Sequence, residues 1–104
     1  MGLDIIDLGV VKSVGNIVAE TAKESVSLLY KIDRARSLDE FWSVLREISR
    51  KMIGLNKEVK KRIKPSSIDD LIQLIKKDER NWQEIKNLLV IYSSMYYSIK
   101  TMER

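Results

Sequence analysis

The sequence contains no cysteine and no histidine in 104 residues. Without cysteine there is no disulfide scaffold and no thiolate metal site, and without histidine the commonest general base and metal ligand are missing. The sequence also lacks a glycine-rich phosphate loop, a nucleophile elbow and zinc-type spacing. We therefore expect no catalytic residue, no metal, no cofactor and no small-molecule substrate, and the protein is predicted not to be an enzyme.

Turn-forming residues and long apolar runs are equally scarce. There is one proline and there are four glycines, which disfavours an all-β fold with its many tight turns. The longest apolar run covers residues 88–92, far short of the roughly 20 residues that span a bilayer. The first residues carry acids where a signal peptide carries bases. We expect one all-helical domain over residues 1–104, cytoplasmic and without membrane contact.

Apolar residues recur at helical spacing from residue 3 to about residue 31. Gly9 and Gly15 interrupt this pattern, and each weakens a helix by about 1 kcal/mol relative to alanine. We expect a frayed or bent start, with firm helix from about residue 16. The β-branched residues near the N-terminus leave a short strand as an alternative.

A second helix is predicted to begin after Ser37, which forms a capping-box pattern with Glu40. The apolar period continues past Gly54 as far as Pro65. Either one helix passes through Gly54 or two helices meet there. We favour one helix over residues 38–63, bent at Gly54 and stopped by Pro65.

A short third helix is predicted after Ser66 or Ser67, and residues 82–102 form the last helix, preceded by a second capping-box pattern at Asn81 and Glu84. The last helix is apolar on two sides, so it is expected to be the centre of a small bundle of about four helices, or the seam of an assembly. One stripe comprises Trp82, Ile85, Leu89, Tyr92, Tyr96 and Ile99, and the other comprises Leu88, Ile91, Met95 and Met102. The predicted core comprises Leu45, Ile48, Leu71, Ile75, Ile85, Leu89 and Tyr92.

Basic residues are concentrated in residues 50–64. Seven bases oppose the single acid Glu58, a net charge of +6 where the whole chain has +4. Such a segment is the expected footprint of contact with a nucleic-acid backbone, whereas a solvated face near a helix C-terminus also prefers cations. The candidate nucleic-acid contacts are Arg50, Lys51, Lys57, Lys60, Lys61, Arg62 and Lys64.

Three further groups of residues were weighed as sites. Aromatic residues beside lysines can stack bases, and the candidates are Trp42, Trp82, Tyr92, Tyr96 and Tyr97. Trp82, Tyr92 and Tyr96 lie on the main apolar stripe, so core or interface packing is expected for them. The acidic pairs 69–70 and 78–79 converge poorly on one metal, and helix capping explains the first pair. Contact with another chain is predicted for Tyr97, Ile91, Met95 and Met102.

Several features together resemble the small helical subunit of archaeal CRISPR interference complexes, with the type I-A subunit closest in size. They are a long first helix, the charged break Asp33-Arg34-Ala35-Arg36, a capped basic helix, and a tyrosine-rich last helix with the sequence LLVIYSSMYY at residues 88–97. The resemblance implies several copies along a guide-RNA-loaded backbone, where they hold the complex together and line the path of unwound DNA. It supplies no catalytic residues, and this chain has no room for the β-insertion of some members.

Two other classes of function stay open. A homo-oligomeric DNA-binding regulator would normally place a short recognition helix after a tight turn, which the predicted long basic helix fits poorly. A structural adaptor that binds only protein would use the surplus apolar surface of the last helix. We expect as partners other subunits of a nucleoprotein complex, several copies of this chain, and an RNA or DNA backbone contacted without sequence specificity.

Overall fold

The computed structural model describes residues 7–22, 26–54, 61 and 67–102, and the regular structure in these ranges is entirely helical. The elements are α1 (Leu8–Ala22), α2 (Ser27–Arg34), α3 (Leu38–Ile53), α5 (Ser67–Lys77), the 3-10 turn η2 (Glu79–Asn81) and α6 (Trp82–Met102). The all-α prediction is confirmed, with five α-helices in the described ranges where about four were expected. The last helix has the predicted bounds.

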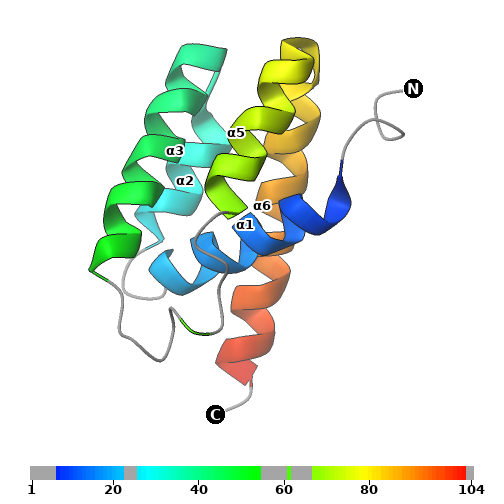
Figure 1. Cartoon of the computed structure of the whole chain (residues 1–104). Helices are drawn as coiled ribbons and strands as arrows, with labels where there is room; N and C mark the ends of the chain where they lie inside the picture. The colour runs from blue at the N-terminus through cyan, green and yellow to red at the C-terminus, as the bar shows by residue number, and fades with distance from the viewer. Residues whose placement is uncertain (1–6, 23–25, 55–60, 62–66, 103–104) are drawn as a thin grey trace.

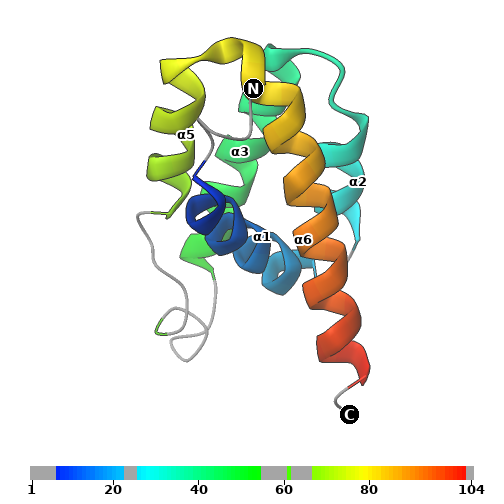
Figure 2. The ribbon, with the colours of Figure 1, turned by 90° about the vertical axis from the view of Figure 1, so that its right-hand side faces the viewer.

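The helices pack around α1. In Figure 1, α3, α5 and α6 stand roughly side by side and α1 lies across α6, and Figure 2 shows α1 between α5 and α6. Helix α1 contacts α2, α3, α5 and α6. Of the two places predicted for α6, the centre of a bundle or the seam of an assembly, the first is shared with α1, which contacts four helices. Helix α1 buries Val14, Ile17 and Val18 completely, so its apolar face is wide enough to meet these neighbours.

One hydrophobic core joins all five helices. Six of the seven predicted core residues are buried, and Tyr92 is partly buried against the same core. The largest fully buried side chains are Phe41, Ile17, Leu28, Ile32, Leu45, Ile48, Ile68, Leu71, Ile75, Ile85, Leu89 and Val11. Every helix contributes to this set, which is why none of them is expected to be stable alone.

Helices α1 and α6 cross in close contact at Gly15. A Cβ atom built on Gly15 would lie 2.9 Å from the Cβ atom of Tyr92 and 3.6 Å from the Ser93 nitrogen. The buried Ser93 hydroxyl donates a hydrogen bond to the Gly15 carbonyl oxygen over 3.2 Å. A glycine and a serine thus bring two helix backbones together. Gly15 lies inside a regular helix, so the predicted frayed start up to residue 16 is wrong.

The predicted long first helix is two helices, α1 and α2. A straight helix over residues 8–34 would be about 40 Å long, which equals the greatest extent of the whole chain at 39 Å. Division into two helices lets Val18 at the end of α1 and Leu28 and Ile32 in α2 all reach the core. The apolar period could not reveal this division, because both helices carry it in nearly the same phase.

Helix α3 ends at Ile53, so the prediction of one continuous helix over residues 38–63 is wrong. The Gly54 N–H donates to the carbonyl oxygens of Lys51 and Met52, which tightens and closes the last turn. The predicted continuation through Leu55, Val59 and Ile63 lies outside the described residues. Glycine is a poor helix former, and here its position favours termination over a bend.

The cap at the start of α3 agrees with the sequence prediction, and the cap before α6 differs from it. Ser37 accepts a hydrogen bond from the Glu40 N–H at 3.2 Å, as the capping-box pattern predicts. The predicted box at Asn81 is wrong, because Asn81 belongs to η2. Asp78 acts as the cap instead and accepts from the Arg80 N–H at 3.1 Å. The chain enters α6 through a tighter turn than a simple N-cap would make.

A lysine from α6 closes α2. The Lys86 ammonium donates to the carbonyl oxygens of Ala35 at 3.1 Å and Asp33 at 3.4 Å. The last carbonyls of a helix have no partner within the helix, and a cation there also interacts favourably with the helix dipole. Lys86 therefore ties the C-terminal end of α2 to α6, a contact between residues distant in sequence.

Candidate nucleic-acid interface and the outer face of α6

The described part of the predicted basic site lies at the C-terminal end of α3. Arg50 and Lys51 form the last turn of this helix and are exposed, and Lys61 is exposed as well. The structure therefore leaves Arg50 and Lys51 accessible to an anionic partner. The other candidate contacts lie outside the described residues; they are Lys57, Lys60, Arg62 and Lys64.

The charges of α3 are arranged along its axis. Acids occupy the first turn and bases the last, and α5 repeats the pattern with Asp69 and Asp70 at its start and Lys76 and Lys77 at its end. Both arrangements match the helix dipole. The helix dipole accounts for the position of the two bases of α3, but it does not account for the five further bases of residues 55–64.

The basic end of α3 carries a local positive potential that acts on Glu47. The Lys31 ammonium contacts the two Glu47 carboxylate oxygens at 2.8 and 3.0 Å, and this hydrogen bond lowers the pKa of Glu47. The charges of Lys31, Lys51 and Arg50 lower the pKa further. The charges of Glu47 and Lys31 cancel each other, so the last turn of α3 keeps the positive charges of Arg50 and Lys51.

The aromatic residues weighed as base-stacking platforms take part in packing. The Phe41 and Trp82 rings lie 6.0 Å apart, and Trp82 is covered by Lys86, whose ammonium is 5.8 Å from the ring centroid. The Tyr92 ring is approached by the Lys12 ammonium at 5.7 Å. The Tyr96 hydroxyl donates to the Glu20 carboxylate at 3.0 Å. These partly buried rings fit the packing interpretation.

One exposed aromatic residue was missed by the sequence reasoning. Tyr30 of α2 is exposed, and the Arg34 guanidinium lies 5.5 Å from its ring centroid. The two residues border a shallow groove of about 580 Å3 between α2 and α3, which is also lined by Lys31 and Glu40. The spacing of four residues on one helix was the available signal. Along this groove two bases of α2, Lys31 and Arg34, face one acid of α3, Glu40.

The two acidic pairs lie near the starts of helices. Asp69 and Asp70 are exposed in the first turn of α5, and the hydrogen bonds from Arg80 to Asp78 lower the pKa of the Asp78 carboxyl. Within the ranges that the structure describes, no three carboxylates come close enough together to hold a metal ion. Asp78 caps η2, and the two acids of α5 match the direction of its helix dipole.

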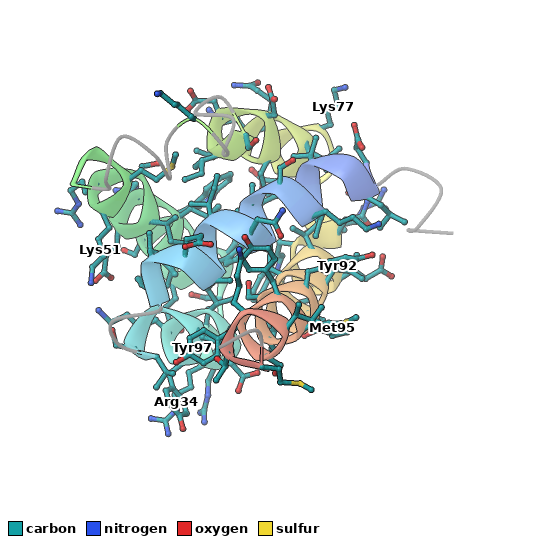
Figure 3. All side chains as sticks on the ribbon, turned by 90° about the horizontal axis from the view of Figure 1, so that it is seen from below. Arg34, Lys51, Lys77, Tyr92, Met95 and Tyr97 are labelled. Atoms are coloured by element: carbon teal, nitrogen blue, oxygen red, sulfur yellow. The ribbon has the colours of Figure 1, made fainter. Side chains whose placement is uncertain are left out.

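The predicted interface residues lie on two different sides of α6. Ile91, Met95 and Met102 are exposed, whereas Tyr97 is partly buried. Residues two apart on a helix differ by about 200°, and Figure 3 accordingly shows Met95 and Tyr97 projecting from opposite sides of α6. Ile99, which the sequence placed on the core stripe, is exposed as well, because the last turns of α6 extend past α1 (Figures 1 and 2).

The basic end of α3 and the apolar face of α6 are separate surfaces. Figure 3 places Lys51 and Met95 at opposite sides of the molecule.

No helix among the described residues is both long enough and apolar enough to cross a bilayer. No protein-family model, curated protein or solved structure matches this chain.

Proposed function

We propose that this protein is a non-catalytic small helical subunit of a multi-subunit nucleoprotein complex, which contacts an RNA or DNA backbone through residues 50–64. The observation that carries the proposal is the charge of this segment, +6 in a chain of net charge +4. The remainder of the chain is therefore close to neutral and slightly acidic. A localised excess of bases attracts a polyanion, whereas an even distribution serves solubility alone.

The expected binding is electrostatic and independent of base sequence. Lysine and arginine contacts to phosphates release counterions and carry no direct sequence information. One short basic segment gives little affinity by itself, and several aligned copies increase it through effective concentration. The resemblance to the small subunit of archaeal CRISPR interference complexes supports the same arrangement, with several copies along a guide RNA or an unwound DNA strand.

A matched pair of charge reversals tests the proposal. Arg50→Glu/Lys51→Glu changes the last turn of α3, and Lys76→Glu/Lys77→Glu makes the same change of charge in the last turn of α5. Both pairs occupy the same kind of helix end, so both lose the same favourable interaction with a helix dipole. Only the first variant is expected to weaken binding to single- and double-stranded nucleic acids beyond the effect of net charge.

The larger effect is expected when Lys57, Lys60 and Lys61 are also changed to Glu. Binding falls alike for all base sequences, and the slope of log K against log salt flattens by about 0.7–0.9 for each lost phosphate contact. Circular dichroism checks that each variant remains folded. The proposal would be refuted if the α3 and α5 variants lost the same amount of binding affinity. It would also be refuted if the variant with all five substitutions bound nucleic acid as the wild type does, both alone and in a purified assembly.

A second candidate function is a structural adaptor that binds only protein. It is favoured by the exposed apolar face of α6, which no described element covers. Purification of the native assembly distinguishes the two. Copurifying guide RNA supports the nucleoprotein subunit, and an assembly free of nucleic acid supports the adaptor. CRISPR-associated genes flanking the coding gene would further favour the first.

A further inference from the structure

Helix α6 has a buried face and, opposite to it, an exposed apolar face. The buried line consists of Ile85, Leu89 and Ser93, which are 0–1% exposed and lie against α1. The opposite line includes Ile91 and Met95, which are 51% and 56% exposed. The two lines are about 200° apart, so the exposed residues are not the margin of the core.

This outer face is also free of charge. Charged residues make up 33% of the chain, yet residues 87–99 contain none. A solvated helix face normally carries charged and polar residues opposite its apolar stripe. Residues 87–99 instead keep a continuous uncharged strip in water, which is typical of a surface that is covered in the working protein.

The apolar side chains on this side of α6, from Leu88 to Met102, are spaced symmetrically about Met95. They follow one another at intervals of three, four, four and three residues, and they are Leu88, which is partly buried against the core, and the exposed Ile91, Met95, Ile99 and Met102. We propose that this face binds a second copy of the chain, with two α6 helices packed antiparallel across a two-fold axis at Met95. Met95 then meets its counterpart, Ile91 meets the partner's Ile99, and Leu88 meets the partner's Met102. A two-fold interface requires such self-complementarity.

Charge also favours a second copy as the occupant. Two copies bring together only uncharged strips, so no like charges are opposed and no charge is buried without a partner. A basic or acidic partner would find no counter-charge over residues 87–99. The first charged residues beyond the strip are Lys86, which is engaged with α2, and Lys100, whose ammonium lies 5.7 Å from the Tyr96 ring centroid.

The available area is close to what a dimer needs. Ile91, Met95, Ile99 and Met102 are 51%, 56%, 54% and 83% exposed. Such exposures leave on the order of 450 Å2 of these residues in water per copy, which is within the range of the largest apolar patch on a typical monomer, a patch that is often functional. Two copies thus bury about 900 Å2 before their polar neighbours are counted, and a specific interface begins near 1,000 Å2. The dimer is therefore expected to dissociate in the micromolar range.

Sedimentation equilibrium on the whole chain tests the association. The wild type is expected to form dimers over micromolar concentrations, and Met95→Lys is expected to weaken dimerisation by at least about 100-fold, because symmetry places two unpaired lysines in one apolar seam. Gln73→Lys is the matched control, since it adds the same charge at an exposed position of α5. It should leave the dimer unchanged.

Cysteine cross-linking tests the antiparallel register, and the absence of native cysteine makes it unambiguous. With oxidised glutathione as the oxidant, Met95→Cys is expected to form a covalent homodimer. Ile91→Cys alone should not, because an offset of eight residues separates the two positions by about 12 Å, beyond the Cα distance of a disulfide. A mixture of Ile91→Cys and Ile99→Cys should cross-link.

Each contrary result overturns the proposal. A wild type that remains monomeric at several hundred micromolar shows that another partner covers α6. Efficient cross-linking of Ile91→Cys with itself shows a parallel or staggered contact. Because the α6 variants leave residues 50–64 unchanged, nucleic-acid binding can be measured on the same proteins. Loss of the dimer with retained binding, or the reverse, therefore separates this inference from the proposed function.

Discussion

The substitution Gly15→Ala tests the close contact between α1 and α6. In an exposed helix interior, replacing glycine by alanine stabilises a protein by about 1 kcal/mol, because alanine loses less backbone entropy on folding. In α1 the new methyl group would lie 2.9 Å from the Cβ atom of Tyr92. Carbon atoms pack best at about 3.5–4.0 Å, so the two helices must separate by roughly 0.6–1 Å.

This separation is expected to outweigh the gain in helix propensity. Overpacking a dense core costs about 1–3 kcal/mol. Moving α6 outward also stretches the 3.2 Å hydrogen bond from Ser93 to the Gly15 carbonyl oxygen, and a buried bond of this kind contributes about 1 kcal/mol. We therefore expect a net loss of about 1–3 kcal/mol in the free energy of unfolding. For a domain of this size the melting temperature should fall by on the order of 10 °C.

Urea unfolding followed by circular dichroism and by tryptophan fluorescence measures this loss. Gly54→Ala is the matched control, because among the described residues a Cβ atom there meets only the Lys51 carbonyl oxygen, at 3.7 Å, and the φ angle of Gly54 is −86°. That backbone suits alanine, so the control should be unchanged or stabilised by up to about 1 kcal/mol. A Gly15→Ala protein as stable as the wild type, or more stable, would show that α1 and α6 do not approach as described.

Three further predictions concern stability. Leu89→Ala removes a fully buried side chain and should cost about 2–5 kcal/mol in urea unfolding; a loss under about 1 kcal/mol would contradict its place in the core. The hydrogen bond and charge of Lys31 lower the pKa of Glu47 below that of an ordinary glutamate. This pair therefore contributes stability at pH values above the ordinary pKa, and the contribution is lost as the pH falls through the lowered pKa of the folded state. The free energy of unfolding, measured from pH 7 to pH 3, should therefore be higher for the wild type than for Glu47→Gln at neutral pH, by at most about 1 kcal/mol for such a partly exposed pair. This difference should disappear in acid, and a difference that stays constant with pH would refute the linkage. Lys86→Met keeps the apolar stem but removes the donor to the end of α2, and we expect a loss of about 1 kcal/mol in thermal unfolding, whereas no loss would mean that water replaces the ammonium.

The candidate nucleic-acid site was predictable as charge but not as geometry. The excess of bases in residues 50–64 is a property of the sequence. Arg50 and Lys51 are exposed, as that prediction requires. The sequence alone could not show that one side of α6 carries the exposed members of the predicted interface and the other side carries a partly buried one. Helix geometry opposes Tyr97 to Met95, but only the packing against α1 shows which of them faces solvent.

Sequence alone determined the helical class, the bounds of α6, the Ser37 cap and most of the core, because apolar period and capping chemistry are local properties. Tertiary structure decided what each apolar face lies against. Gly15 has a low helix propensity in α1, but its lack of a side chain allows α6 to approach α1 closely. Ile99 continues the core period of α6 but extends past α1 into solvent. Periodicity specifies the direction of a side chain around its own helix, and only the other helices determine whether that direction leads to protein or to water.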